Sequence, residues 1–265
     1  MQLPIRRSLA LVAALALAAC SRDTLPTGAT ADDLFASVTV DPIVGAEAGQ
    51  SSELGLTMDP AVTYEGALGS ATVCVYSTTS KRVECPPVTR GGLTFTRSIA
   101  FFDAAGASQT ARDANTRSAN TRIDVTGNAT TPKGTLAIVR SSDLTVSGLG
   151  RAATTHTING LETGKSSGTL TTDRGSVVLS EVTSSQAEKV VVPVPAKAGS
   201  YPLSGTTTRS GTTNATRAAT GETRTSSWSE KVTYTGTNVV TVVITRDGKS
   251  KNCTRDLAAH KTTCS

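Results

Sequence analysis

Hydrophobic and polar residues alternate with a period of two over most of the chain after residue 70, a pattern typical of β-strands with one buried face. Residues 93–101 show it most plainly, because every second side chain except Arg97 is apolar: Leu93, Phe95, Ile99 and Phe101. The pattern returns near the C-terminus, where one strand face carries Trp228, Val232 and Tyr234. No comparable helical stripe follows the first twenty residues, and no alternation of strands with helices indicates a parallel sheet.

Short candidate strands follow one another with turn residues between them. The other candidates are 70–77, 81–85, 121–126, 134–140, 144–149, 154–159, 168–172, 176–182, 189–194, 239–245 and 250–254. Gly, Asn and Asp predict turns at Gly127-Asn128, Asn159-Gly160, Asp173-Arg174-Gly175, Gly236-Thr237-Asn238 and Asp247-Gly248. Residues 107–120 are polar, and we predict an edge strand or a long loop there. Residues 206–224 are mostly Thr, Ala, Arg and Gly, and we predict a polar strand or loop. We therefore predict an all-β fold, an antiparallel meander that forms a sandwich, an open barrel or a curled sheet.

Composition agrees with this fold class and limits the core. Roughly one residue in six is Thr, and Val, Ser and Gly are also abundant, as in strands and turns. Aromatic residues make up only 3%, and Trp228 is the sole Trp. The core should therefore be thin and consist mostly of Val, Leu, Ile and Ala.

Four of the five cysteines are arranged as two equally spaced pairs. Ten residues separate Cys74 from Cys85, and ten separate Cys253 from Cys264. Two-residue turns at Thr79-Ser80 and Ala258-Ala259 would place the members of each pair directly opposite each other on a hairpin. Opposed residues of an antiparallel pair lie about 4.5–5.5 Å apart, within reach of a disulfide. A metal site is the alternative, but this spacing is not that of zinc ligands. We predict the disulfides Cys74–Cys85 and Cys253–Cys264.

The first twenty residues have the three zones of a secretory signal. Arg6 and Arg7 make the start basic, and residues 9–17 are apolar and shorter than the roughly 20 residues that span a bilayer. The following residues, Leu17-Ala18-Ala19-Cys20, resemble the lipobox of bacterial lipoproteins. This resemblance implies that the signal peptide 1–19 is removed, that Cys20 is acylated, and that the protein is held on a membrane. Because Ser21 and not Asp follows Cys20, the resemblance favours the outer membrane. The alternative is an ordinary signal peptide with a chance cysteine.

Charge divides the mature chain into two parts. Residues 21–65 hold eight acidic residues and one base, Arg22, whereas residues 66–265 hold 23 basic and 13 acidic residues, a net charge of +10. We interpret 20–49 as an acidic flexible tether and 50–265 as a single β-rich domain. The basic charge is either an ordinary soluble surface or a surface that meets an anionic envelope component, such as lipid phosphates. Nucleic acid is not expected, because the protein is exported and few aromatics accompany its basic residues.

Two motifs suggest chemistry but lack the context that it needs. Gly160–Ser166 resembles a phosphate-binding loop with one residue too few between the glycines, and no helix start follows it. A Gly-rich hairpin turn is the simpler interpretation of that stretch. Gly164–Gly168 matches a nucleophile elbow by letter, but polar residues precede the Ser and a Thr-rich strand follows it, so we interpret this match as chance. His156 and His260, the only histidines, are expected on the surface. We therefore predict no catalytic residue, cofactor site or metal site.

These observations predict a membrane-anchored, non-enzymatic cell-envelope lipoprotein that binds a partner, for example an envelope protein, or has a structural role. The alternative is a carrier or sensor that holds a lipid or other apolar ligand on a curved sheet. An enzyme would need converging titratable groups, which the sequence does not reveal.

Overall fold

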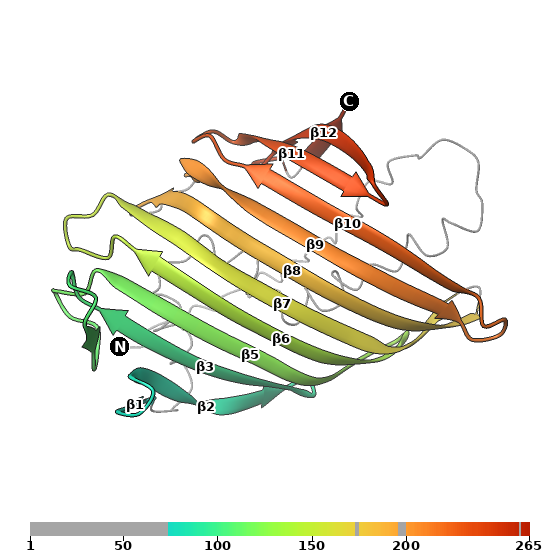
Figure 1. Ribbon diagram of the computed structural model, residues 1–265, viewed down its shortest axis with the longest axis horizontal. Coiled ribbons are helices and arrows are strands. Elements are labelled where there is room, and N and C mark those ends of the chain that lie inside the picture. Colours follow the sequence, from blue (N-terminus) through green and yellow to red (C-terminus); the bar gives the residue numbers. More distant parts are fainter. Residues whose placement is uncertain (1–73, 173–174, 196–199, 260) are drawn as a thin grey trace, which may run out of the picture. The chain divides into compact units, whose positions relative to one another are not determined.

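The computed structural model describes residues 74–172, 175–195, 200–259 and 261–265. The signal peptide, Cys20, the acidic tether, the predicted start of the domain at residue 50, Asp173-Arg174 and His260 lie outside the described residues. Thirteen strands and no helix form within them (Figure 1). The strands are β1 (Val75–Ser77), β2 (Arg82–Arg90), β3 (Leu93–Phe102), β4 (Ser108–Gln109), β5 (Ser118–Thr131), β6 (Gly134–Ser147), β7 (Thr155–Thr172), β8 (Gly175–Pro193), β9 (Ser204–Arg217), β10 (Thr223–Thr233), β11 (Val239–Arg246), β12 (Lys249–Asp256) and β13 (Lys261–Cys264).

All strand pairs are antiparallel and belong to one sheet. Each strand pairs with the next along the chain, except that β5 follows β3 directly and the short β4 pairs with β3 off this path. The path runs from β1 to β13 without closing on itself, so the sheet is open (Figure 1). The predicted all-β antiparallel meander is confirmed, and among its three forms the structure has the single sheet.

The central strands are much longer than the sequence predicted. Segments expected as separate strands join into β6 (134–140 with 144–149), β7 (154–159 with 168–172) and β8 (176–182 with 189–194). The predicted turn at Asn159-Gly160 is wrong, since the ladder there contains only a bulge between Ile158 and Gly160. The expected hairpin turn over Gly160–Ser166 is also wrong, because these residues are the middle of β7.

The turn predicted at Gly127-Asn128 is also wrong, and the backbone around Gly127 explains why. Gly127 lies within β5 opposite Leu93 and has a φ of +141°. A Cβ at this position would come 2.2 Å from the Gly92 carbonyl oxygen. The glycine is therefore required by a close backbone approach inside the sheet and does not mark the end of a strand.

The C-terminal meander agrees closely with prediction. The expected strands and the turns at 236–238 and 247–248 correspond to β10, β11 and β12, and β8 ends at Pro193. The segment 107–120, for which the sequence predicted either an edge strand or a long loop, contains β4, a loop and the start of β5. The segment 206–224 is β9, a turn and the start of β10.

The sheet has two chemically different faces. We call the face that carries Leu136, Ile138, Leu170, Leu179 and Val242 the apolar face, because these side chains are at most 1% exposed. Register continues it across neighbouring strands, since Leu136 pairs with Gly168, Gly168 with Leu179, and Leu179 with Ala215. Its buried residues are mostly Val, Leu, Ile and Ala, as composition predicted.

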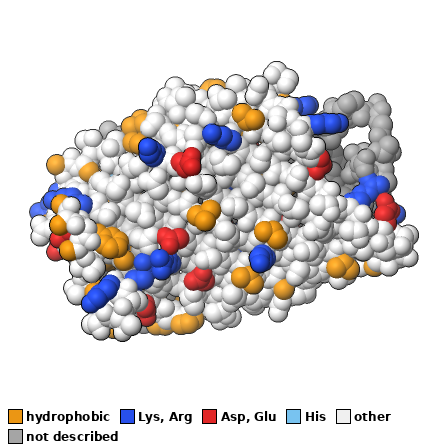
Figure 2. Space-filling model, in the orientation of Figure 1, with side chains coloured by type: hydrophobic (Ala, Val, Ile, Leu, Met, Phe, Trp, Pro, Cys, Tyr) orange, Lys and Arg blue, Asp and Glu red, His pale blue; other side chains and the backbone are white. Residues whose placement is uncertain are grey.

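The opposite face is mostly neither charged nor hydrophobic, with scattered charged and apolar side chains (Figure 2). Register places many Ser and Thr residues on it, with exposed Val139, Leu161 and Val182 among them, and we call it the hydroxyl face. Hydroxyl pairs close successive hairpins on this face at one end of the sheet. The Oγ atoms of Thr89 and Thr94 are 3.0 Å apart, and those of Thr216 and Thr223 are 2.8 Å apart. Such cross-strand pairs stabilise the ladder and maintain its register.

Both ends of the strand path are held by disulfides. Cys74 is bonded to Cys85 across the β1–β2 hairpin, and Cys253 to Cys264 across the β12–β13 hairpin. The register also agrees with prediction, because Tyr76 pairs with Val83 and Cys253 with Cys264. The first connecting loop is longer than predicted, with four residues (78–81) between the paired Ser77 and Arg82. The predicted pairing is confirmed, and each disulfide fixes the short strand at one end of the path.

Candidate functional site

A row of charged side chains crosses the middle of the apolar face. Arg140 on β6 lies 3.8 Å from Glu162 on β7, with side chains only 16% and 20% exposed. On β8, Glu181 is buried and accepts a hydrogen bond of 3.2 Å from Thr213 Oγ1 on β9. We call these residues, with Glu230 and Arg255 described next, the ionic belt. A charge on a half-buried apolar face is costly unless it is paired, and each belt carboxylate has a cation or a hydroxyl beside it.

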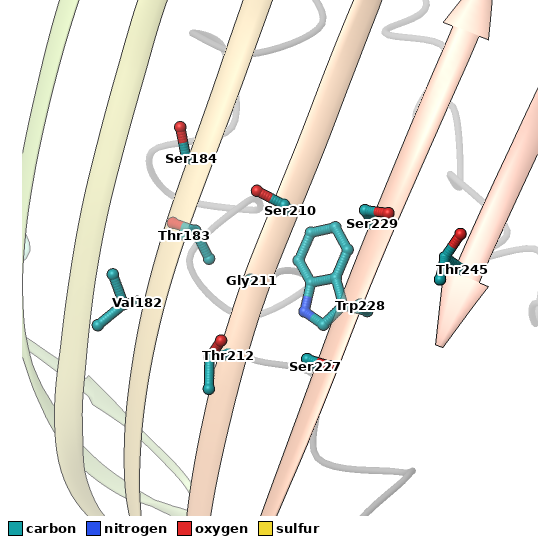
Figure 3. A pocket seen from close by; sticks show the side chains of 10 residues that line it. All are labelled: Val182, Thr183, Ser184, Ser210, Gly211, Thr212, Ser227, Trp228, Ser229 and Thr245. Carbon is teal, nitrogen blue, oxygen red and sulfur yellow. The ribbon is translucent and has the colours of Figure 1, made fainter. Parts of the chain in front are cut away.

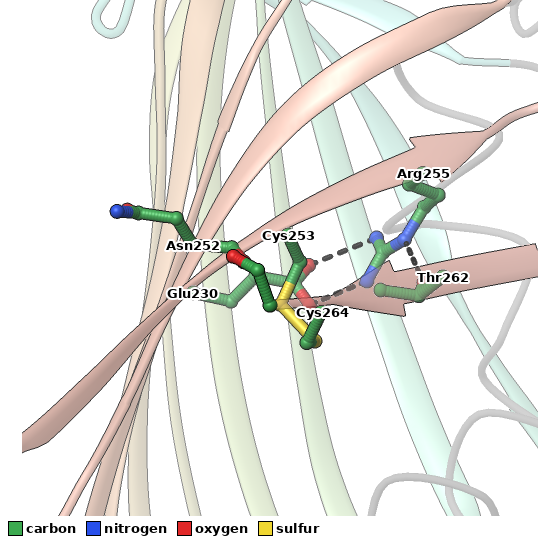
Figure 4. The surroundings of a disulfide bond; sticks show 7 residues. Glu230, Asn252, Cys253, Arg255, Thr262 and Cys264 are labelled. Carbon is green, nitrogen blue, oxygen red and sulfur yellow. Dashed lines mark hydrogen bonds and ion pairs between the residues drawn. A yellow bond between two sulfur atoms is a disulfide. The ribbon is translucent and has the colours of Figure 1, made fainter.

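Glu230 and Arg255 form the best-defined pair of the belt. Arg255 donates from Nη1 to Glu230 Oε1 at 3.0 Å and from Nη2 to Oε2 at 2.6 Å. Its Nε donates to Thr262 Oγ1 at 3.0 Å, beside the Cys253–Cys264 disulfide (Figure 4). This two-pronged bond links β10 to β12 across β11 and so fastens the C-terminal hairpin to the long strands.

The motifs resembling nucleotide and hydrolase sites lie inside β7 and cannot perform those functions. Ser166, the candidate nucleophile, pairs with Glu181 on β8 in mid-strand. His156 is ten residues away on the same strand, about 33 Å at the usual rise per residue. Gly164 serves packing, because a Cβ there would come 2.6 Å from Thr183 Oγ1 and 3.4 Å from Arg140 Cγ.

A polar cluster that the sequence did not reveal joins β2, β3, β5 and β6 on the hydroxyl face. Arg82, only 9% exposed, donates from Nε to Ser98 Oγ at 2.7 Å and from Nη2 to the Asn120 carbonyl at 3.0 Å. Burial, and then the nearby Arg122, lowers the pKa of Arg82. Arg122 Nε lies 2.8 Å from Asp143 Oδ2, and Asn120 Nδ2 donates to Asp143 Oδ1.

The carboxylate of Asp143 is therefore well supported. Burial opposes its ionisation, but the hydrogen bonds from Asn120 and Arg122 and the charge of Arg122 outweigh that effect and lower its pKa. All of these side chains are engaged with one another across four strands. The cluster is suited to fixing strand register and offers no reactive group.

A groove of about 400 Å³ lies on the hydroxyl face between β8 and β11 (Figure 3). Its centre is the backbone of Thr183, Gly211 and Trp228, which pair directly with one another. Rows of side chains flank this centre, formed by Ser184, Ser210, Ser229 and Thr245 on one side and by Val182, Thr212 and Ser227 on the other. Hydroxyls can donate and accept, and none of the lining residues is charged, so the groove suits a neutral polar ligand.

A second pocket lies at the end of the sheet, where the loop before β5 meets the β6–β7 loop. We call it the end pocket; it has a volume of about 460 Å³ and is lined by Arg112, Asp113, Ala114, Leu149, Gly150, Arg151, Ala153, His156 and Val194. His156 is 6% exposed, so the prediction of a surface histidine is wrong. Residues 107–117 and 148–153 had no apolar period, which is why the sequence could not bring them together.

No side-chain cluster of His, Cys, Asp and Glu suited to a metal ion occurs among the described residues. Within the same part of the chain, no helix is long and apolar enough to cross a membrane.

Comparison with known proteins identifies no relative. No protein-family model, curated protein or solved structure matches the chain.

Proposed function

We propose that the protein is a non-enzymatic cell-envelope lipoprotein, held on the outer membrane through acylated Cys20, that binds a partner with the hydroxyl face of its sheet. The support for the anchor is the sequence, since residues 1–20 have the zones of a lipoprotein signal. The support for binding is the groove between β8 and β11, which is the observation that carries the proposal.

The short, disulfide-bonded outer strands favour a face over an edge as the binding surface. An open sheet edge can add a strand from a partner, but only where backbone groups are free and the strand is long enough. Here the outermost strands are β1, with three residues, and β13, with four, and a disulfide fixes each. On β2, Pro86 and Pro87 interrupt the ladder where β1 no longer covers it.

Carriage of an apolar ligand is less well supported. A carrier needs an accessible cavity with apolar lining. On the apolar face, large side chains such as Leu136 and Val190 are fully buried, and the ionic belt crosses this face. The exposed apolar side chains, such as Val139 and Leu161, lie among polar residues on the opposite face and line no apolar cavity among the pockets described above. Hydroxyls dominate the groove, while charged residues surround the end pocket.

Site-specific photocrosslinking in intact cells tests the proposal. A photoreactive amino acid at Thr212, in the groove, should yield a discrete crosslinked product. The same residue at Thr126, which is exposed on β5 of the same face, should not. Products of equal yield at both positions, or none at Thr212, would contradict binding through the groove.

A further inference from the structure

The end pocket combines a buried floor with a basic rim. His156 and Leu149 form the floor and are 6% and 7% exposed, whereas Arg112 and Arg151 are exposed. Ala153 and Val194 add apolar wall. A ligand that fits here would place charged atoms at the rim and a less polar portion against the wall.

A third guanidinium reinforces the positive charge. Arg117 Nη1 donates to the carbonyl oxygens of Ala114 at 3.0 Å and Thr116 at 3.1 Å. The side chain lies against Gly150, whose ideal Cβ position is 3.7 Å from Arg117 Cδ. Arg117 is thereby fixed behind the pocket wall that Ala114 and Gly150 form.

The one carboxylate of the pocket is occupied by its own loop. Asp113 Oδ1 accepts hydrogen bonds from the Asn115 amide at 2.7 Å and from Gln109 Nε2 at 3.0 Å. The Asn115 bond is the main cause of a lowered pKa for Asp113, so this residue is ionised at neutral pH. Arg112 and Arg151 thus line the pocket with a single carboxylate, Asp113, so its described lining residues carry a formal net charge of +1.

We propose that the end pocket binds a phosphate ester, with Arg112 and Arg151 donating to the phosphate oxygens. The planar guanidinium fork matches phosphate geometry, and two forks facing one cavity suit a tetrahedral anion. The volume of about 460 Å³ leaves room for the group that the phosphate carries. The inference goes beyond the proposed function, because the pocket and the hydroxyl groove are built from different residues and either can fail alone.

Calorimetric titration of the mature lipoprotein in a neutral maltoside detergent tests the proposal. The probes are inorganic phosphate, glycerol 3-phosphate and monomeric dihexanoyl phosphatidylglycerol. We expect saturable binding of at least one probe, weakened about tenfold or more in the double variant Arg112→Ala/Arg151→Ala, since each arginine supplies charge-assisted hydrogen bonds. Binding of the soluble phosphates identifies a free phosphate compound as the ligand class, and binding of the phospholipid alone identifies a lipid headgroup.

A matched variant separates a site from general charge attraction. Lys249→Ala/Lys251→Ala removes the same charge from exposed positions on β12 and should leave affinity within twofold of the native protein. Arg151→Glu, at an exposed position, should abolish binding while the thermal melting curve stays native-like. Absence of binding by all three probes, or equal weakening in the lysine variant, would overturn the proposal.

Discussion

The indole of Trp228 lies directly against Gly211, its partner on the neighbouring strand. A Cβ at residue 211 would stand 2.7 Å from Trp228 Nε1 and 2.8 Å from Cε2 (Figure 3). The glycine leaves a gap in the face of β9, and the ring fills it. The sole tryptophan of the chain is thus used for packing opposite a glycine, an arrangement that protects glycine in a sheet.

Gly211→Ala should therefore force the indole out of its position. We predict a loss of about 1–3 kcal/mol in the free energy of unfolding, the usual cost of overpacking. Tryptophan fluorescence should shift to the red, because the ring becomes more hydrated, and urea titration gives the free energy. Ser210→Ala is the control, because its side chain lies on the hydroxyl face, and it should change the free energy of unfolding and the emission wavelength very little. A Gly211→Ala variant with native stability and native fluorescence would contradict this packing.

The Glu230–Arg255 pair should contribute measurable coupling energy. Its side chains are 21% and 27% exposed and make two parallel hydrogen bonds. A double-mutant cycle of Glu230→Gln and Arg255→Met, followed by urea unfolding, should give about 1–2 kcal/mol. The more exposed pair Glu222 and Arg224 provides the comparison and should give about 0.5 kcal/mol or less. Equal coupling in the two pairs would show that the belt pair does not fasten the C-terminal hairpin.

Asp143 should make stability depend on pH in acid. Its pKa is lower in the folded protein than the value of about 3.9 in an unfolded chain, so the unfolded state binds more protons. The stabilisation is fully present above about pH 5 and is lost as the pH falls through about 4 towards the lower folded pKa. Because the side chain is 46% exposed, the contribution is about 1 kcal/mol or less.

The stability difference between the native protein and Asp143→Asn should accordingly be largest at pH 6–7 and shrink below pH 4. Urea unfolding at several pH values measures it, and Asp124→Asn on β5 controls for the loss of one exposed negative charge. A stability difference between the two proteins that grew as the pH fell would contradict a lowered pKa of Asp143 in the folded state.

Loss of the C-terminal disulfide should destabilise the edge of the sheet. The disulfide closes a loop between two cysteines that are eleven positions apart in the sequence. The double variant Cys253→Ser/Cys264→Ser opens this loop, and the gain in chain entropy of the unfolded state should lower the free energy of unfolding by about 2–3 kcal/mol. Hydrogen exchange should increase first in β12 and β13, while β6 and β7 stay protected. Uniform exchange across the sheet would indicate that the hairpin is not an independent edge element.

The sequence predicted the fold class, the two disulfides and the C-terminal meander because each follows from local patterns. Alternation of apolar residues sets strand faces, and two-residue periodicity with equal spacing puts Cys253 opposite Cys264. Strand length was not predictable in the same way. Polar residues of the ionic belt, such as Arg140 and Glu162, interrupt the apolar period in mid-strand and resemble loop residues until their cross-strand partners are known.

The candidate sites were less predictable than the fold. The groove depends on Ser210 and Ser229 lying side by side on strands of known register, and isolated serines carry no such information. The end pocket brings Arg112 and Arg151 together from two loops whose sequences have no periodicity. Gly160 and Gly127 were misinterpreted because close packing and turns both require glycine.

Cell fractionation of the Cys20→Ala variant beside the native protein tests whether Cys20 anchors the protein to the outer membrane. We expect the native protein to sediment with outer membranes and to carry an acylated N-terminal cysteine by mass spectrometry, whereas the variant should lack acylation and leave the outer-membrane fraction. Retention of Cys20→Ala in that fraction, or a native protein without acyl groups, would contradict anchoring through Cys20.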